Sequence, residues 1–165
     1  MKFILNTDAI DGRGFLDPRY TCDADHSSPE LRWEGEPEST ESFALIMDDP
    51  DAPQGVFTHW LVYQIPRTLH HLPAGIPPQE LLPNGVRQGV NDFERLGYGS
   101  PCPPRGASPH RYVFRLYALN LLPHSPEIQR LSRCTREELW SIIQTHVLSE
   151  AKVVALYRES LRKTA

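Results

Sequence analysis

The sequence of 165 residues has no long hydrophobic run and no excess of positive charge. No stretch approaches the ~18 consecutive apolar residues of a membrane-spanning helix. The N-terminal apolar run, Phe3–Leu5, ends at Asn6, whereas a secretory signal needs a longer apolar region. Lys and Arg number 17 against 21 Asp and Glu, so the net charge of −4 has the wrong sign for a general nucleic-acid or anionic-membrane surface. We therefore expect no nucleic-acid binding and no stable membrane insertion.

Cysteine is also scarce. The three cysteines, Cys22, Cys102 and Cys134, are widely spaced and form no Cys-x-x-Cys pair. An odd number at this spacing predicts free thiols in a reducing compartment and neither a disulfide framework nor a zinc ribbon. Together with the short N-terminal apolar run, this pattern makes the cytoplasm the expected location.

Proline, in contrast, is abundant: the 16 prolines are nearly twice the usual share of about 5%. Proline at this level argues against an all-helical bundle and favours short strands joined by structured loops. The length is that of one compact domain, and the chain contains no repeat or linker. Residues 1–165 are therefore expected to form a single domain.

Strands dominate the predicted secondary structure. Aromatic and β-branched residues predict strands at Lys2–Leu5, Leu31–Trp33, Ser42–Asp48, Thr58–Ile65, His110–Leu119 and Val153–Tyr157. Ser125 followed by Pro126 starts a short helix, and Thr135 with Glu138 forms a capping box that opens an amphipathic helix over Arg136–Ser149. The fold class is mainly β: an antiparallel β-sandwich with a few peripheral helices.

Three ionisable residues, Asp49, His59 and His110, lie at ends of the predicted strands. Residues two apart share one face of a strand, so each of the three continues a row of apolar side chains. These rows are Phe43-Leu45-Met47, Leu61-Tyr63-Ile65 and Tyr112-Phe114-Leu116-Ala118. Antiparallel pairing brings all three ionisable groups to the same end of the sheet, where Asp51 is also available. We expect a small polar pocket there, at one edge of the core.

Each of these features also has a purely structural interpretation. The Asp49–Pro53 segment is compatible with turn chemistry alone, and a single inward histidine is usually a core residue. Burying ionised groups costs several kcal/mol each, however, so three converging groups favour a functional pocket. The loop at residues 97–109 is rich in Gly and Pro and is either an ordinary connection or a backbone site for an anion.

Enzymatic chemistry is the alternative to ligand binding. Asp49, His59 and His110 have the chemistry of zinc ligands, although none belongs to a short local ligand motif. Cys102 would be a nucleophile beside His110, but nearby aspartates oppose the thiolate. The sequence contains neither a P-loop nor a dinucleotide-binding fingerprint. A metal-dependent or acid–base hydrolase using Asp49, His59 and His110 is therefore the second interpretation, and no cofactor or resident metal is expected.

Four short motifs follow one another along the chain: Asp49-Pro50-Asp51-Ala52-Pro53, Thr58-His59-Trp60, Gly97-Tyr98-Gly99 with Pro101-Cys102-Pro103-Pro104, and His110-Arg111-Tyr112. In this order they resemble the phosphatidylethanolamine-binding protein family, the group that includes Raf kinase inhibitor protein. The length and the Cys-Pro-Pro form are most similar to its short prokaryotic, Raf kinase inhibitor-like branch. The resemblance implies an antiparallel β-sandwich with a small pocket for phosphate-like groups, including the phosphatidylethanolamine headgroup.

The resemblance also implies a set of ligand-binding residues. By motif these are Asp49, Asp51, His59, Gly99, Pro104, His110 and Tyr112, with the Gly97–Gly99 backbone on the donor side of the pocket. A carboxylate beside a histidine favours the imidazolium form, which can hold a phosphate, and a carboxylate can receive an ammonium group. The implied function is non-enzymatic binding of a small anionic ligand, with a kinase or protease as a further class of partner. A symmetric homodimer is the default assembly.

Two residues depart from the family pattern. Ser100 stands where the family often has glycine, and Glu94 replaces a common glycine after Asn-Asp-Phe. If the backbone at Ser100 requires positive φ, the mouth of the pocket is altered. After Tyr157 we expect no counterpart of the C-terminal helix that borders the pocket in longer eukaryotic members.

Overall fold

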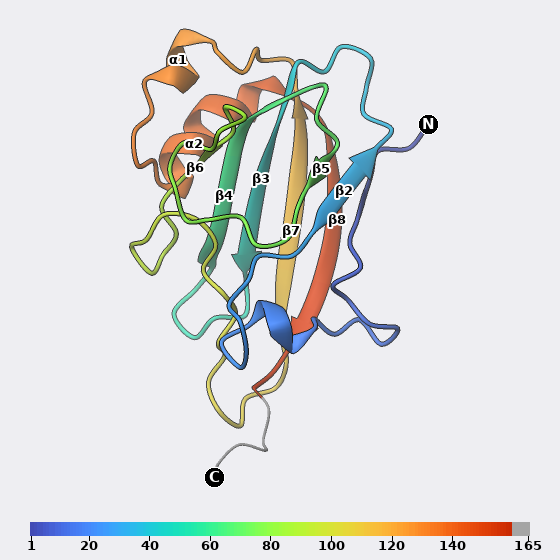
Figure 1. Cartoon of the computed structure of the whole chain (residues 1–165), viewed down its shortest axis with the longest axis vertical. Helices are drawn as coiled ribbons and strands as arrows, with labels where there is room; N and C mark the ends of the chain where they lie inside the picture. The colour runs from blue at the N-terminus through green and yellow to red at the C-terminus, as the bar shows by residue number, and fades with distance from the viewer. Residues whose placement is uncertain (160–165) are drawn as a thin grey trace.

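The computed structural model describes residues 1–159, and its core is two antiparallel sheets packed face to face (Figure 1). The strands are β1 (Ile4–Asn6), β2 (Leu31–Glu34), β3 (Ser42–Asp49), β4 (Phe57–Pro66), β5 (His71–Leu72), β6 (Arg87–Gln88), β7 (His110–Leu119) and β8 (Val147–Tyr157). The larger sheet has the order β6-β4-β3-β7-β8 and the smaller one β1-β2-β5. Every neighbouring pair is antiparallel, which confirms the predicted β-sandwich.

The helical segments are short. They are α1 (Pro126–Gln129), α2 (Arg136–Ile143) and two 3₁₀ turns, η1 (Pro18–Tyr20) and η2 (Gln144–His146). Within residues 1–159, no helix has the length and apolar character needed to cross a membrane. The expected absence of a C-terminal helix concerns residues that fall largely outside the described part of the chain.

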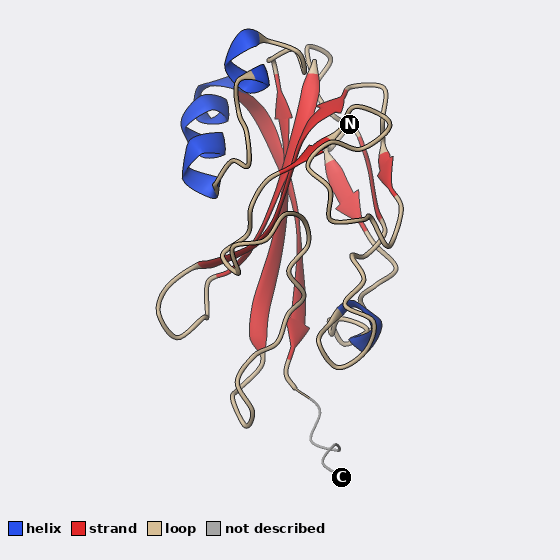
Figure 2. Ribbon diagram, turned by 60° about the vertical axis from the view of Figure 1, so that its left-hand side comes forward, coloured by secondary structure: helices blue, strands red, loops and turns tan. Residues whose placement is uncertain are grey.

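Strand β3 lies at the centre of the larger sheet and is buried along its whole length. One face, with Phe43, Leu45 and Met47, packs in the core beneath the small sheet, and the other face packs with Ala44 and Ile46 towards α2. Figure 2 shows this arrangement, with α1 and α2 on one side of the larger sheet and the small sheet on the other. A strand covered on both faces is apolar at successive positions, as the sequence of β3 is.

The pairing of β3 with β4 is interrupted at two points where β4 contains one extra residue. Between Phe43 and Leu45 the partner changes from Ile65 to Val62, and Gln64 in this stretch has φ of 60°. Such a bulge bends the strand and changes which face its side chains take. The expected row of Leu61, Tyr63 and Ile65 is therefore wrong. Leu61 and Tyr63 face the helices, whereas Ile65 faces the small sheet.

Helix α2 starts as predicted but ends earlier. The Thr135 Oγ1 accepts from the Glu138 N–H at 3.3 Å and the Glu138 Oε1 accepts from the Thr135 N–H at 3.0 Å, which confirms the capping box. The predicted helix end at Ser149 and strand start at Val153 are wrong, because β8 begins at Val147. The β7 strand offers a hydrogen-bonding edge along all of β8, and this long-range pairing overrides the local helical pattern.

A disulfide joins Cys22 to Cys102, which lie 80 positions apart in the sequence and have Cα atoms 5.4 Å apart. The prediction of free thiols is therefore wrong for these two and correct for Cys134, which is free and buried. Local spacing could not reveal the pair, because folding brings the 97–109 loop against the N-terminal segment. The Cys22 N–H donates to the Pro101 carbonyl at 3.1 Å, and the Tyr98 hydroxyl donates to the Tyr20 carbonyl at 2.8 Å.

Reduction of the Cys22–Cys102 bond should lower the free energy of unfolding by about 3–5 kcal/mol, because the unfolded chain loses a long loop constraint. Urea unfolding with and without dithiothreitol measures this difference. The Cys134→Ala variant should lose stability on reduction as the wild type does, and the Cys22→Ala/Cys102→Ala variant should show no reductant effect. Identical wild-type midpoints in the two conditions would contradict the prediction.

Candidate functional site

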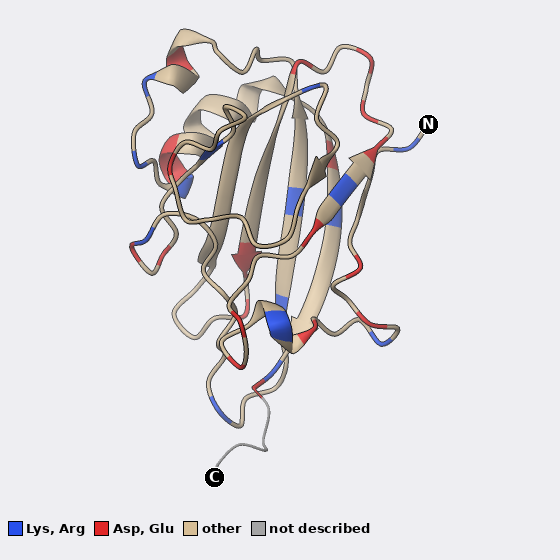
Figure 3. Cartoon of the chain, in the orientation of Figure 1, with Lys and Arg blue, Asp and Glu red and all other residues tan. Residues whose placement is uncertain are grey.

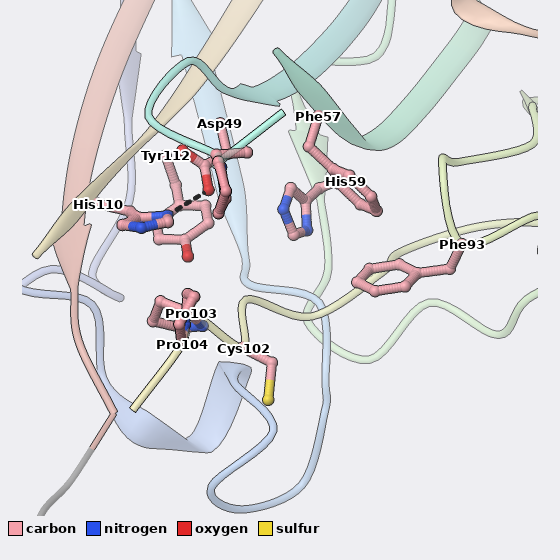
Figure 4. Close-up of a pocket in the computed structure, with 11 residues that line it drawn as sticks. Asp49, Phe57, His59, Phe93, Cys102, Pro103, Pro104, His110 and Tyr112 are labelled. Carbon is pink, nitrogen blue, oxygen red and sulfur yellow. Dashed lines mark hydrogen bonds and ion pairs between the residues drawn. The ribbon is translucent and has the colours of Figure 1, made fainter. Parts of the chain in front are cut away.

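A cavity of about 210 Å³ opens where β3 ends and where β4 and β7 begin (Figure 4). It lies beneath the loop of residues 97–109, which we call the proline-rich loop. Five of the predicted site residues line it: Asp49, His59, Pro104, His110 and Tyr112. The antiparallel order explains the convergence, because Met47 of β3 is paired with Trp60 of β4 and with Phe114 of β7. The end of one strand and the starts of its two neighbours therefore meet at the same end of the sheet.

His59 reaches the cavity through the second irregularity of β4. The partners of Met47 and Asp48 are Trp60 and Thr58, so His59 is the extra residue of a bulge. A bulge re-aims a side chain that regular alternation would send to the other face. The neighbouring aspartates of β3 show the normal alternation: Asp49 lines the cavity, and Asp48 pairs with Arg136 of α2 at 2.9 Å on the opposite face.

Asp49 and His110 form a buried pair. The His110 Nδ1 and the Asp49 Oδ2 are 2.6 Å apart, and the two residues are 7% and 3% exposed. The other Asp49 oxygen, Oδ1, accepts from the Asp51 N–H at 2.8 Å. Because the carboxylate accepts, Nδ1 of His110 carries a hydrogen, and Nε2 is the ring nitrogen left for a ligand. The second hydrogen bond holds the carboxylate in the orientation that positions the ring.

His59 is held by the loop in a similar way. Its Nδ1 lies 2.6 Å from the Gly99 carbonyl, and its own carbonyl accepts from the Gly99 N–H at 2.8 Å. Since a carbonyl only accepts, Nδ1 is the donor and Nε2 is again left free. Burial lowers the pKa of His59, although the Gly99 carbonyl and the charge of Asp49 partly oppose this effect. The ring is therefore neutral at pH 7 and presents an accepting nitrogen.

Aromatic rings surround His59 and account for its desolvation. Its ring centroid lies 5.0 Å from that of Phe57, 5.6 Å from Phe93 and 5.3 Å from Tyr112. Burial also raises the pKa of Tyr112, so its hydroxyl stays protonated and can donate to a ligand. In Figure 4 this hydroxyl points into the cavity, towards the loop prolines. The cavity thus combines apolar walls with a few polar groups, as small-ligand sites do.

Asp51 does not line the cavity, contrary to its predicted role as a ligand contact. Its carboxylate accepts from the Arg111 Nε at 3.0 Å, from Nη2 at 2.8 Å and from the Arg111 N–H at 2.8 Å. The hydrogen bonds to Arg111 lower the pKa of Asp51 to about 2. Asp51 is therefore ionised and neutralised by Arg111, and it ties the turn after β3 to the start of β7.

The N–H groups of Gly97 and Gly99 are both used within the protein, so these two glycines do not form the expected anion nest. The Gly97 N–H donates to the Gly89 carbonyl at 3.1 Å, and the Gly99 N–H is used by His59. Gly99 contributes a carbonyl that orients His59 and does not line the cavity itself. A Cβ atom at Gly99 would lie 2.6 Å from the Phe93 ring, so the close approach of these two segments requires glycine.

The two departures from the family pattern have different consequences. Glu94 has φ of 64°, which explains why glycine suits this position. Ser100 does not adopt positive φ, so its side chain is accommodated without strain, and its Oγ lies 2.8 Å from the His26 Nδ1. The mouth of the cavity is therefore compatible with serine at this position.

Sequence reasoning missed two of the cavity walls, Phe57 and Phe93. Phe57 lies two positions before His59, and Phe93 belongs to the Asn-Asp-Phe segment, but neither carries a chemical signal of its own. Cys102 also lines the cavity, yet its sulfur is in the disulfide and is not a thiolate nucleophile. Within residues 1–159, no three His, Cys, Asp or Glu side chains are grouped so that they could hold a metal ion.

Comparisons with known proteins agree with this geometry. The family model described as phosphatidylethanolamine-binding protein matches residues 6–158. The chain is 44% identical over 154 residues to a UPF0098 protein of Methanothermobacter thermautotrophicus, covering 93% of this chain and 97% of that protein. It is 43% identical to a UPF0098 protein of Aquifex aeolicus, covering 84% and 78%. The crystal structure of Escherichia coli YbcL, described as a new member of the mammalian PEBP family, superposes with a TM-score of 0.86 at 31% identity, covering 97% of this chain and 100% of that one. The chain belongs to the phosphatidylethanolamine-binding protein family.

Proposed function

We propose that this protein binds a small anionic ligand, a phosphate or a phosphorylethanolamine-type headgroup, in the cavity of Asp49, His59 and His110. The observation that carries the proposal is the pair of histidines, each held through Nδ1 so that Nε2 is left for a ligand. The cavity of about 210 Å³ is smaller than the roughly 300–1,000 Å³ of drug-sized ligand sites, so it suits a headgroup better than a whole lipid.

The chemistry of binding follows from these positions. A protonated His110 keeps its Nδ1–H on Asp49 and offers Nε2–H to an anion oxygen, and the Tyr112 hydroxyl is a further donor. His59 is neutral in the free protein, but an anion in the cavity favours its imidazolium form. Binding should therefore be accompanied by proton uptake at His59.

An ammonium group of the ligand would contact the aromatic side chains of Phe57 and Phe93, which line the cavity. Both oxygens of Asp49 already accept hydrogen bonds, from His110 and from Asp51, which makes this carboxylate a poor site for an additional cation. Phe57 and Phe93 lie with ring centroids 4.7 Å apart at the cavity and offer π faces, which attract ammonium groups. Phosphorylethanolamine would then bind through its phosphate on the histidines and its ammonium at the phenylalanines.

The proposal includes binding without turnover, because the one cysteine that lines the cavity, Cys102, is in a disulfide and is not available as a nucleophile. A kinase or a protease is the class of protein partner that the family resemblance adds. The cytoplasmic location stays a prediction. Disulfides persist mainly in oxidising compartments, so the cysteines no longer support that location.

Anion affinity should decrease as the pH rises from about 6 to about 8, because a histidine of the site loses its proton. The decrease should reach up to roughly tenfold per pH unit for one histidine. Calorimetric titration with sulfate measures this dependence without a change in the charge of the ligand. Phosphate and phosphorylethanolamine titrations then show which headgroup binds more tightly. The His71→Ala variant, an exposed histidine of β5 outside the cavity, should keep the wild-type profile. A pH-independent sulfate affinity would contradict the role of the histidines.

The Tyr112→Phe variant should weaken anion binding by roughly 5- to 20-fold, because one hydrogen bond to the charged ligand is lost. The free energy of unfolding should change little, since the ring and its packing remain. Tyr117→Phe is the matched control, because Tyr117 is a buried tyrosine of the same strand that packs against Trp140 on the opposite face. Equal anion affinities for wild type and Tyr112→Phe would show that this hydroxyl does not contact the ligand.

Phosphoester hydrolysis separates binding from the alternative, a metal-dependent or acid–base hydrolase using Asp49, His59 and His110. We expect no turnover of p-nitrophenyl phosphate by the wild type, with or without added zinc. Turnover that is lost in His59→Ala and retained in His71→Ala would establish the hydrolase and overturn the non-enzymatic proposal.

A further inference from the structure

The disulfide between Cys22 and Cys102 lies between two cavities. Cys102 lines the cavity of Asp49, His59 and His110, which we call the anion cavity, and both cysteines line a second cavity of about 740 Å³. The two cavities share Cys102 and one phenylalanine in their linings, so they lie side by side. The volume of the second cavity is within the roughly 300–1,000 Å³ of small-molecule sites, so a small reagent can enter it and approach the bond.

The disulfide is accessible, unlike the third cysteine. Cys102 is exposed and Cys22 is half-buried, whereas Cys134 is buried and free. In Figure 4 the Cys102 sulfur points away from His59 and His110. Thiols reduce an exposed disulfide more readily than a buried one. A reagent can therefore reach the bond in the folded protein without passing between the two histidines.

The chain around Cys22 is held by bonds that do not involve its sulfur. The Cys22 N–H donates to the Pro101 carbonyl at 3.1 Å. The next residue, Asp23, accepts a hydrogen bond on its carboxylate from the hydroxyl of Tyr157 at the end of β8. These bonds remain when the disulfide is reduced, so Cys22 keeps its place beside the proline-rich loop and the disulfide can form again.

The Cys102–Pro104 segment, in contrast, depends on the disulfide for its attachment. Its two prolines line the anion cavity and have no N–H to donate. Within residues 1–159, the one hydrogen bond of this segment runs from the Ala107 N–H to the last of its carbonyls at 3.1 Å, inside the loop itself. The ion pair of Arg105 with Glu159 follows directly, but the Arg105 side chain is exposed, so the pair contributes little. Apart from apolar packing, the disulfide thus fixes this wall of the anion cavity to the rest of the protein.

We infer that the Cys22–Cys102 bond is a redox modification site, at which a small neutral dithiol enters the second cavity, reduces the bond and thereby weakens ligand binding in the anion cavity. The inference rests on the proposed anion binding. Reduction frees the proline wall, which must then be ordered again when an anion binds, so the affinity falls. Gly99 is held by His59 and not by the disulfide, so the orientation of His59 is kept. Reduction therefore changes the strength of binding and leaves the histidines in place.

The reaction is thiol–disulfide exchange with the dithiol as reductant. A thiolate of the dithiol attacks the exposed Cys102 sulfur, forms a mixed disulfide with it and displaces Cys22 as a thiolate. The second thiol of the reductant then attacks the reductant's first sulfur and releases Cys102 as a thiolate. Both cysteines take up a proton, and the reductant leaves as a cyclic disulfide. Two electrons and two protons thus pass from the dithiol to the cysteines.

The charges around the second cavity favour a neutral reductant. Arg95 and His26 line this cavity, and no carboxylate does. Asp23 and Asp25 lie just before His26 in the sequence, however, and Figure 3 shows acidic residues on the segment that follows η1. Because neither sign of charge prevails, dithiothreitol, which is uncharged, is the suitable probe.

The test compares the sulfate affinities of the oxidised and the reduced protein by calorimetric titration in native buffer, without and with dithiothreitol. Mass spectrometry after alkylation counts the thiols in each sample. Reduction should proceed without denaturant and should weaken sulfate binding by roughly 3- to 10-fold. The Cys134→Ala variant should respond as the wild type does, and the Cys22→Ala/Cys102→Ala variant should have the weaker affinity in both buffers.

Linkage supplies a second measurement. If reduction weakens sulfate binding, saturating sulfate must make the disulfide harder to reduce by the same factor. The fraction of reduced protein at fixed ratios of reduced to oxidised dithiothreitol, with and without sulfate, measures this factor. Sodium chloride at the same ionic strength is the control and should leave the fraction unchanged.

Equal sulfate affinities of the oxidised and the reduced protein would overturn this inference alone. A bond that dithiothreitol reduces only in denaturant, or a reduced chain that circular dichroism shows to be unfolded, would also contradict it, because the bond would then hold the fold and not the loop. An oxidised wild type that binds neither sulfate nor phosphate would overturn the proposed function, and this inference with it.

Discussion

The antiparallel pairing of β3 with both β4 and β7 is the constraint on which the rest of the structure depends. It buries β3 on both faces and brings Asp49, His59 and His110 together at one end of the central strands. The bulge at His59 is part of this pairing, because one extra residue in β4 turns the imidazole towards the cavity. The site is therefore built on rigid strands, and the proline-rich loop closes over it.

Burial and hydrogen bonding act together on the two histidines of the site. Aromatic rings remove water from His59 and lower its pKa, while the Gly99 carbonyl fixes which ring nitrogen carries the hydrogen. His110 is oriented by Asp49, whose second oxygen is in turn held by the backbone of Asp51. A site prepared in this way loses little conformational freedom when a ligand binds, which supports the proposed recognition of a small anion.

Much of the fold and part of the site could be predicted from local patterns. Strand β7 appeared with its full length and its inward row, and the capping box of α2 was correct because it depends on residues three positions apart. Five of the seven predicted ligand residues line the cavity. Asp51 and Gly99 do not, because the bonds that occupy them, to Arg111 and to His59, join segments far apart in the sequence. Phe57 and Phe93 were missed because a phenylalanine that lines a site has the same sequence pattern as one in a core.

The sequence by itself determined the fold class, the family motifs and the ionisable residues at the ends of the central strands. These follow from residue types, from period-two alternation and from short-range capping. Only the tertiary structure decided the bulges of β4, the early end of α2, the Cys22–Cys102 disulfide and the use of the glycine N–H groups. Each of these depends on a backbone or covalent partner many residues away. Whether a long-range partner is present and in register is settled when the sheets assemble, and local periodicity carries no information about it.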